Sequence, residues 1–154
     1  MSEWLKERDW KSRGRVTLPR GFESHPLRCR NRTAREPLTG PHRISRLGFV
    51  NCYLVSEDDG LTLVDTMLPG SSKRILAVAE GLGRPIVRVV LTHAHGDHVG
   101  SVDALAAKLP DAEVSISARD ARLLEPDKSL DPGEPKDKLR GSYPGTKTRP
   151  HRTF

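Results

Sequence analysis

The sequence predicts an α/β layered fold for residues 42–125, and three observations lead to this prediction. Short apolar segments rich in β-branched residues alternate with segments whose apolar residues recur at helical spacing. Glycine and proline separate these segments, as is typical at the ends of strands and helices. Such alternation is typical of a sheet covered by helices.

The first elements are strand-like. Residues 42–57, HRISRLGFVNCYLVSE, are predicted to form one or two strands, with a turn in the polar stretch EDDG at 57–60. LTLVDT at 61–66 predicts the next strand. GSSKRILAVAEGLG at 70–83 predicts a helix, because a serine pair can cap its start, apolar residues form a stripe and a glycine can end it.

The second group of elements repeats the alternation. PIVRVVLT at 85–92 predicts a buried strand, because it is nearly all apolar and β-branched. GSVDALAAKLP at 100–110 predicts a helix that ends at its proline. AEVSISA at 112–118 then predicts a strand, and ARDARLLE at 118–125 a short helix.

The segment before this region, residues 1–41, is basic and rich in proline, and we expect it to be disordered. Its EWLK, DWKS and GFES stretches can be back-translated, in order, into parts of a serine transfer-RNA gene. Residues 1 to about 30 therefore resemble a translated tRNA gene upstream of the true start. An ordinary basic tail is the alternative.

The segment after it, residues 126–154, holds five prolines and little apolar content. This composition predicts a Pro/Gly/basic linker with nothing to dock on.

Composition excludes several classes of protein. There is no apolar run of membrane-spanning length and no secretory signal, and the two cysteines form no close-spaced framework, so we expect a cytoplasmic protein without a membrane partner. The net charge is +6, but residues 1–46 carry +7 while 47–125 carry −4. Because the basic excess lies outside the region that looks folded, we do not expect nucleic acid as the partner.

The stretch LTHAHGDHVG at 91–100 places three histidines and an aspartate within six positions. His93 and His95 are two residues apart at the end of a predicted strand, so in an extended segment they point to the same side. The carboxyl ends of strands are where α/β sheets usually hold ligands. Imidazole and carboxylate groups suit zinc, and also iron or manganese.

THAHGDHVGS at 92–101 resembles the HxHxDH signature of the metallo-β-lactamase superfamily. VNCYLV at 50–55 and LTLVDTMLPG at 61–70 resemble that family's opening strands. The resemblance covers about residues 42–125. It implies the N-terminal half of an αββα sandwich, with a mixed sheet covered by helices on one face.

The resemblance also implies a set of site residues. His93 and His95 would bind a first zinc ion and Asp97 and His98 a second, while Asp65 would orient the ligands through hydrogen bonds. Asp97 is also the candidate catalytic residue. The implied reaction is zinc-dependent hydrolysis of an ester, amide, thioester or phosphodiester, with the small-molecule substrate unknown.

The sequence departs from the family's pattern after residue 98. The family uses two further histidines and a bridging aspartate from its second half, and here only His151 follows, in a Pro/Arg-rich context. Asp127, Asp131 and Asp137 lie in the predicted linker and are not assigned as ligands. We therefore expect a truncated, incomplete site, weak zinc binding, little hydrolysis, and self-association through the uncovered sheet face.

Two other functions are compatible with the sequence. One is a non-catalytic metal-binding or interaction half-domain. The other is a nucleic-acid-processing member of the same superfamily, which only the basic ends favour.

Overall fold

The computed structural model describes residues 40–125, 127–135 and 140–154. A mixed sheet of six strands in sequential order forms the described part of the chain. Strands β1 (His42–Arg46), β2 (Val50–Glu57) and β3 (Gly60–Val64) are antiparallel neighbours. Strands β4 (Ile86–Val90), β5 (Glu113–Ile116) and β6 (Arg152–Thr153) continue from β3 in parallel. The predicted α/β class and mixed sheet are confirmed.

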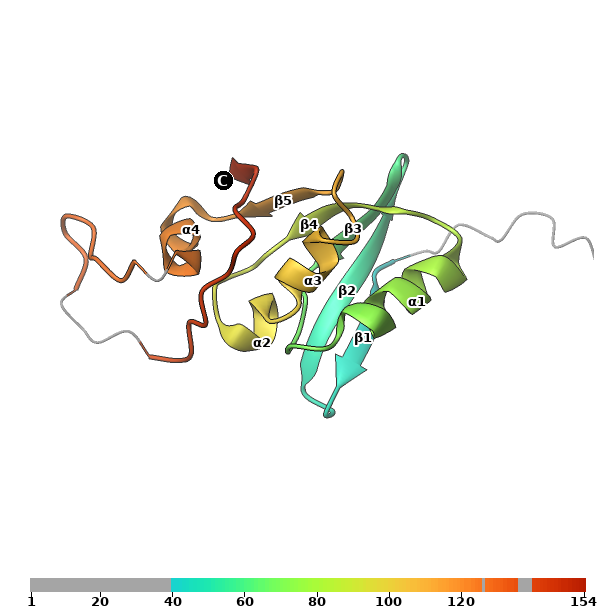
Figure 1. The fold of residues 1–154 in the computed structure, drawn as a ribbon, viewed down its shortest axis with the longest axis horizontal. Helices are drawn as coiled ribbons and strands as arrows, with labels where there is room; N and C mark the ends of the chain where they lie inside the picture. The colour runs from blue at the N-terminus through green and yellow to red at the C-terminus, as the bar shows by residue number, and fades with distance from the viewer. Residues whose placement is uncertain (1–39, 126, 136–139) are drawn as a thin grey trace, which may run out of the picture. The chain divides into compact units, whose positions relative to one another are not determined.

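Along the described part of the chain, four helices alternate with the strands (Figure 1). They are α1 (Ser72–Leu82), α2 (Gly96–Val99), α3 (Val102–Ala106) and α4 (Ala118–Leu124). Helix α1 ends at Leu82 and is capped by Gly83, one of the two glycines expected to stop it, with a left-handed φ of 72°. The predicted cap at its start does not form, because the Ser71 hydroxyl donates to the carbonyl of Leu68 instead.

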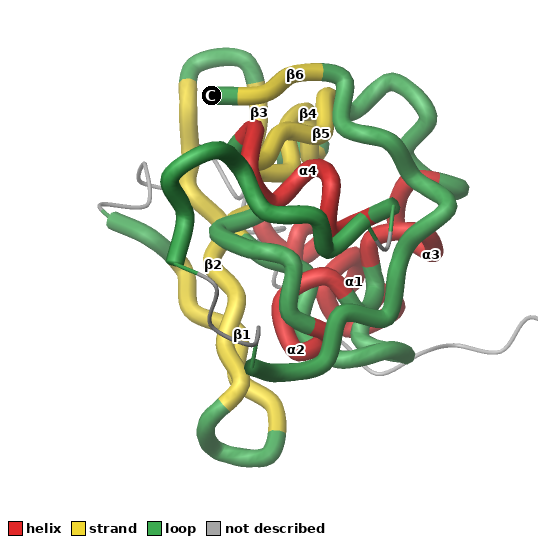
Figure 2. The backbone as a smooth tube through the Cα atoms, turned by 90° about the vertical axis from the view of Figure 1, so that its left-hand side faces the viewer, coloured by secondary structure: helices red, strands yellow, loops and turns green. Residues whose placement is uncertain are grey.

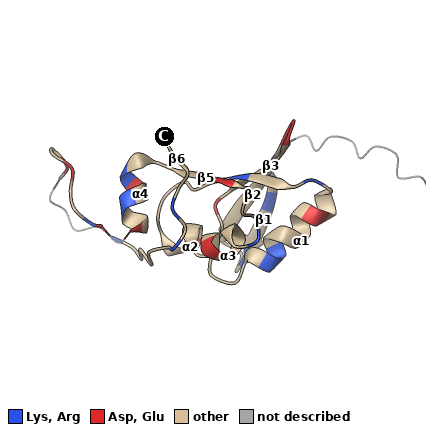
Figure 3. Cartoon of the chain, turned by 45° about the horizontal axis from the view of Figure 1, so that its top comes forward, with Lys and Arg blue, Asp and Glu red and all other residues tan. Residues whose placement is uncertain are grey.

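Helices α1, α2 and α3 cover one face of the sheet, as Figure 3 shows from a second direction. Alternate residues of each strand point toward them: on β2, Val50, Cys52 and Leu54 are buried, while Tyr53 is 36% exposed. The buried apolar core consists of the following residues: Ile44, Val50, Cys52, Leu54, Leu61, Leu63, Met67, Ile75, Ala79, Ile86, Val89, Leu91, Ala94, Val99, Val102, Leu105, Val114, Ile116, Leu123 and Leu124.

The opposite face of the sheet is mixed in character. Tyr53 pairs across the strands with Val64, and Val64 with Val90, so these three side chains form a row on that face. Arg88 lies on the same face and makes ion pairs of 2.6 Å with Glu57 and Asp59. This face of the sheet therefore combines an apolar row with an ion-paired arginine.

The C-terminal segment corrects one prediction. Residues 140–154 were predicted to be part of a linker with nothing to dock on, and this is wrong. The backbone N–H of Thr146 donates to the carbonyl of Leu124, that of His151 to Val114, and β6 adds to the edge of β5. Figure 2 shows this segment running past the helices to reach the sheet. Hydrogen bonding of its backbone, which composition does not reveal, holds it in place.

Two predictions concern other parts of the chain. The basic leader, with its resemblance to a translated tRNA gene, lies outside the described residues apart from Gly40 and Pro41. Among the helices of the described part, none has the length and apolar character required to cross a membrane.

Candidate metal centre

The candidate site lies where two parallel strands end side by side. Asp65 directly follows β3, and the stretch from Thr92 to His98 follows β4. The two segments are joined by backbone hydrogen bonds, from Asp65 N–H to the Val90 carbonyl at 2.9 Å and from Thr66 N–H to the His98 carbonyl at 2.7 Å. Because the carboxyl ends of parallel strands meet at one edge, residues 27 or more positions apart converge here.

His93 and His95 approach each other through one ring nitrogen each. His93 Nε2 lies 3.0 Å from His95 Nδ1, and the ring planes are inclined by 78°. Two imidazole nitrogens bound to one tetrahedral zinc ion at about 2.0–2.1 Å lie ~3.3 Å apart. The spacing of the two nitrogens therefore fits a shared metal ion after a small outward movement.

Asp97 and His98 form a second pair at the start of α2. Asp97 Oδ2 lies 3.5 Å from His98 Nε2, and the Asp97 and His98 side chains are 48% and 28% exposed. The other nitrogen of His98, Nδ1, lies 2.8 Å from Asp65 Oδ2. A carboxylate can only accept, so His98 Nδ1 is assigned as the protonated nitrogen, which leaves the lone pair of Nε2 free beside Asp97.

Asp65 is the hydrogen-bond centre of the site. It is 6% exposed and its carboxylate accepts from Thr92 N–H at 2.8 Å, from the Thr92 hydroxyl at 2.9 Å and from His98. Its backbone has a left-handed φ of 62°, a conformation that aspartate adopts more readily than most residues. This bend turns the carboxylate of the β3 end toward the residues that follow β4.

Thr92 connects Asp65 to His93. Its hydroxyl donates to Asp65, so its oxygen can accept from His93 Nδ1, which lies 3.1 Å away. The pKa of His93 is lowered, first by burial and then by the neighbouring rings of His98 and His95. His93 is therefore neutral at neutral pH, as a metal-binding imidazole must be.

The outer nitrogen of His95 has partners that the sequence did not indicate. His95 Nε2 lies 3.0 Å from the carbonyl oxygen of Arg140 and 3.0 Å from the hydroxyl of Tyr143. Tyr143 is the single Phe, Tyr or Trp residue of the stretch 126–153, and this was the one feature of the sequence that could have indicated its contact with the site. Asp120 was also missed; it accepts from the backbone N–H of Ala94, between the two histidines.

Within the described ranges, no group of three or more histidine, cysteine, aspartate or glutamate residues is placed to hold one metal ion together. The predicted ligands form two pairs, each open to further ligands. Asp127 and Asp131 are exposed, and Asp127 accepts from Ser129, whereas Asp137 lies outside the described residues.

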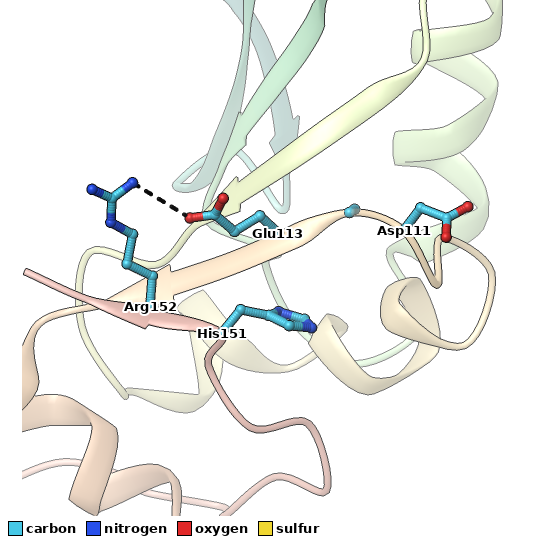
Figure 4. Close-up of a pocket in the computed structure, with 5 residues that line it drawn as sticks. Asp111, Glu113, His151 and Arg152 are labelled. Atoms are coloured by element: carbon cyan, nitrogen blue, oxygen red, sulfur yellow. Dashed lines mark ion pairs between the residues drawn. The ribbon is translucent and has the colours of Figure 1, made fainter.

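His151 takes no part in these pairs. It lines an open depression at the β5–β6 edge together with Glu113 and Arg152, which form an ion pair of 3.9 Å (Figure 4). Its Nδ1 accepts from the backbone N–H of Val114. His151 thus serves the docking of β6.

Residues 45–153 match the family model described as the metallo-beta-lactamase superfamily. The chain belongs to this superfamily. The resemblance seen in the HxHxDH stretch is thereby confirmed at the level of the family. The match extends through the C-terminal segment, in agreement with its docking on the sheet.

Relatives within the metallo-beta-lactamase superfamily include proteins with and without a stated activity. The uncharacterized protein YobT of Bacillus subtilis is 50% identical over 103 residues, 66% of this chain and 44% of YobT. A hydroxyacylglutathione hydrolase of Xanthomonas euvesicatoria pv. vesicatoria is 39% identical over 61 residues, 40% of this chain and 23% of that protein.

A solved structure is similarly matched over only part of its length. BJP-1, a subclass B3 metallo-beta-lactamase of Bradyrhizobium japonicum, is 27% identical with a TM-score of 0.51, over 68% of this chain and 39% of BJP-1. The chain thus spans less than half the length of these relatives.

Proposed function

We propose that the chain carries one half of a zinc-dependent hydrolase site, with His93 and His95 for one metal ion and Asp97 and His98 for another. The observation that carries this proposal is the convergence of His93 Nε2 and His95 Nδ1 to 3.0 Å at the carboxyl end of the sheet. Imidazole nitrogens are among the ligands that zinc prefers, and these two lie close enough to share one ion. Membership of the metallo-beta-lactamase superfamily supports the proposal.

When bound, zinc would supply the chemistry of hydrolysis, because it lowers the pKa of coordinated water to about 7 and stabilises developing negative charge. The chain's own residues prepare the site for it. Asp65 fixes His98 with Nε2 free, and Thr92 offers His93 an acceptor for its Nδ1 proton. Asp97, half exposed, is the candidate catalytic residue, since its carboxylate faces both His98 and solvent.

The substrate class follows the hydrolases that the chain resembles: a small molecule with an ester, amide, thioester or phosphodiester bond. Hydroxyacylglutathione hydrolases are among the relatives, and they favour the acyl derivatives within this set. Nucleic acid is the less supported substrate, because Arg88 on the exposed sheet face is paired with Glu57 and Asp59.

Each metal ion would find two ligands among the residues that the structure describes. We therefore expect weak zinc binding and little hydrolysis by the chain alone. Calorimetric titration of zinc into the full chain tests the proposal, with His95→Ala as the site variant and His42→Ala, on the exposed start of β1, as the matched control.

The expected result is weak uptake that His95→Ala removes and His42→Ala leaves unchanged. Equal uptake by wild type and His95→Ala would contradict the assignment of ligands. Tight, stoichiometric binding of two zinc ions would contradict the view that the site is incomplete.

A non-catalytic interaction half-domain is the second candidate, and the row formed by Tyr53, Val64 and Val90 favours it. This row alternates along β2 with the buried residues that face α1, α2 and α3, so it lies on the opposite face of the sheet. We propose that two copies of the chain associate through it.

A further inference from the structure

We propose that Asp120 is a positioning residue of the candidate metal centre, which holds the backbone between His93 and His95 and thereby fixes the approach of their rings. Asp65 holds the other side of His93, so that the two carboxylates act as a clamp on the chain at this histidine. The inference rests on the proposed function, because it concerns the same pair of histidines, and it adds a residue from a third strand end to their support.

The stretch that carries the two histidines, residues 91–95, lies between two regular elements. Strand β4 ends at Val90 and helix α2 begins at Gly96. The backbone N–H groups of this stretch therefore need acceptors other than those of an ordinary strand or helix. Leu91 N–H still donates to the Ser115 carbonyl of the neighbouring strand β5, at 2.8 Å. Beyond Leu91, two side-chain carboxylates supply acceptors.

The two carboxylates of the clamp reach this stretch from opposite sides. Strand β4 lies between β3 and β5 in the sheet, and the three strands run parallel (Figure 1). Asp65 directly follows β3 and accepts from Thr92 N–H at 2.8 Å. Asp120 lies in the first turn of α4, which follows β5, and accepts from Ala94 N–H at 3.1 Å. Carboxylates therefore hold the backbone N–H groups on both sides of His93.

The carboxylate of Asp120 is itself held in place. Its Oδ2 accepts from the Ser117 hydroxyl at 2.7 Å, and its backbone N–H donates to the same hydroxyl oxygen at 3.1 Å. The other oxygen, Oδ1, is directed to Ala94. Ala94 is 1% exposed, so water has no access to its N–H unless the site opens. Loss of the carboxylate would leave a buried donor without its acceptor and loosen the stretch.

The hydrogen bond to Ala94 bears on the rings through the backbone. His95 has an extended backbone, with φ −71° and ψ 149°. Side chains two positions apart along an extended segment point to the same side. Ala94 is the residue between the two histidines, so a fixed Ala94 N–H constrains the directions of both side chains. Their rings meet at 3.0 Å, between His93 Nε2 and His95 Nδ1.

The first test uses amide hydrogen exchange of the metal-free full chain, followed by NMR. We expect the Ala94 amide to exchange about 10-fold faster, relative to Leu91, in Asp120→Ala than in the wild type. Leu91 is the internal reference, because a general loss of stability would speed both amides. Asp120→Asn keeps an acceptor oxygen and should keep the protection. Ser117→Ala removes the hydroxyl beside Asp120 but leaves the acceptor of Ala94, so it is the matched control.

The wild-type measurement decides the proposal even if a variant fails to fold: an Ala94 amide that exchanges like an unprotected amide would overturn it. Unchanged relative exchange in a folded Asp120→Ala chain would also overturn it. The second readout is the nuclear Overhauser effect between the ring protons of His93 and His95. We expect this effect in the wild type and in Asp120→Asn, and a weaker one in Asp120→Ala. An equally strong effect in Asp120→Ala would overturn the positioning role.

Zinc affinity, measured by competition with a chromophoric chelator, separates positioning from charge. Burial is the main cause that lowers the pKa of His93, and the charge of Asp120 opposes it, so this charge acts on the site. We expect Asp120→Ala to weaken zinc binding by about 10-fold, as the loss of a residue that supports metal ligands typically does, and Asp120→Asn to bind as the wild type does. Equal losses in the two variants would overturn positioning in favour of charge.

The same measurements separate this proposal from the proposed function. If the Ala94 amide and the ring contact depend on Asp120 while the wild type binds no zinc, the clamp stands and the metal assignment fails. If zinc binds through His93 and His95 while the Ala94 amide exchanges freely, the metal assignment stands and the clamp fails.

Discussion

Replacing Asp103 by alanine should detach the C-terminal segment from α3. The carboxylate accepts three hydrogen bonds, from Lys147 N–H, Thr148 N–H and the Thr148 hydroxyl. Hydrogen bonds to charged groups contribute about 1.5–3 kcal/mol each when buried, and these are partly exposed, so we expect a loss of about 2–4 kcal/mol for the three together. Asp103→Asn keeps one acceptor oxygen, and we expect about half of that loss.

Urea denaturation of the full chain followed by circular dichroism measures this change in the free energy of unfolding. Burial alone would raise the pKa of Asp103, but the hydrogen bonds from Thr148 and Lys147 outweigh it and lower the pKa. The contribution of this carboxylate is therefore present above its unfolded-state pKa of 3.8 and is lost as the pH falls through the lower folded-state value. The wild type and Asp103→Asn should converge in stability on acidification.

Asp111→Ala, at an exposed turn before β5, is the control. Equal stability of Asp103→Ala and Asp111→Ala chains at neutral pH would refute the reasoning, because the C-terminal segment would then be held by other contacts. A difference between wild type and Asp103→Asn that persists undiminished at low pH would refute the assigned role of the charge.

Three further predictions follow from the structure. Burial raises the pKa of the Cys52 thiol from 9.0 to about 12, so above pH 9 unfolding releases its proton. In a Cys29→Ser chain, urea denaturation should therefore show the free energy of unfolding falling by ~1.4 kcal/mol per pH unit above pH 9, relative to the same chain with Cys52→Ala. Val64→Glu should keep the chain monomeric in sedimentation at concentrations where the wild type associates; a monomeric wild type would contradict self-association. Arg46→Ala should lower the free energy of unfolding by about 1–2 kcal/mol, since Arg46 donates to the Pro69 carbonyl and Ser71; a thermal denaturation midpoint equal to the wild type's would contradict this.

The fold was predictable where local patterns decide it. The strand at 85–92 is observed as β4, Gly83 ends α1, and the 42–57 stretch divides into two strands around Gly48, whose φ of 82° suits the turn. The short helix α2 was not predicted, because four residues give too little periodicity to recognise.

The site was predictable only within one segment. The spacing of His93, His95, Asp97 and His98 is visible in the sequence because all four lie within six positions. The contact of Tyr143 with His95 spans 48 positions and depends on backbone hydrogen bonds of a Pro/Gly-rich stretch. Composition predicts that such a stretch is loose, since backbone hydrogen bonding leaves no side-chain pattern.

The most direct test of the central claim is zinc titration of the full chain with the histidine ring signals followed by NMR. We predict that zinc shifts the signals of His93, His95 and His98, with His93 bound through Nε2 and His95 through Nδ1. The signals of His42 and His151 should stay in place. Zinc-induced shifts at His42 or His151 with His93 and His95 unchanged would contradict the claim that the strand-end histidines form the metal site.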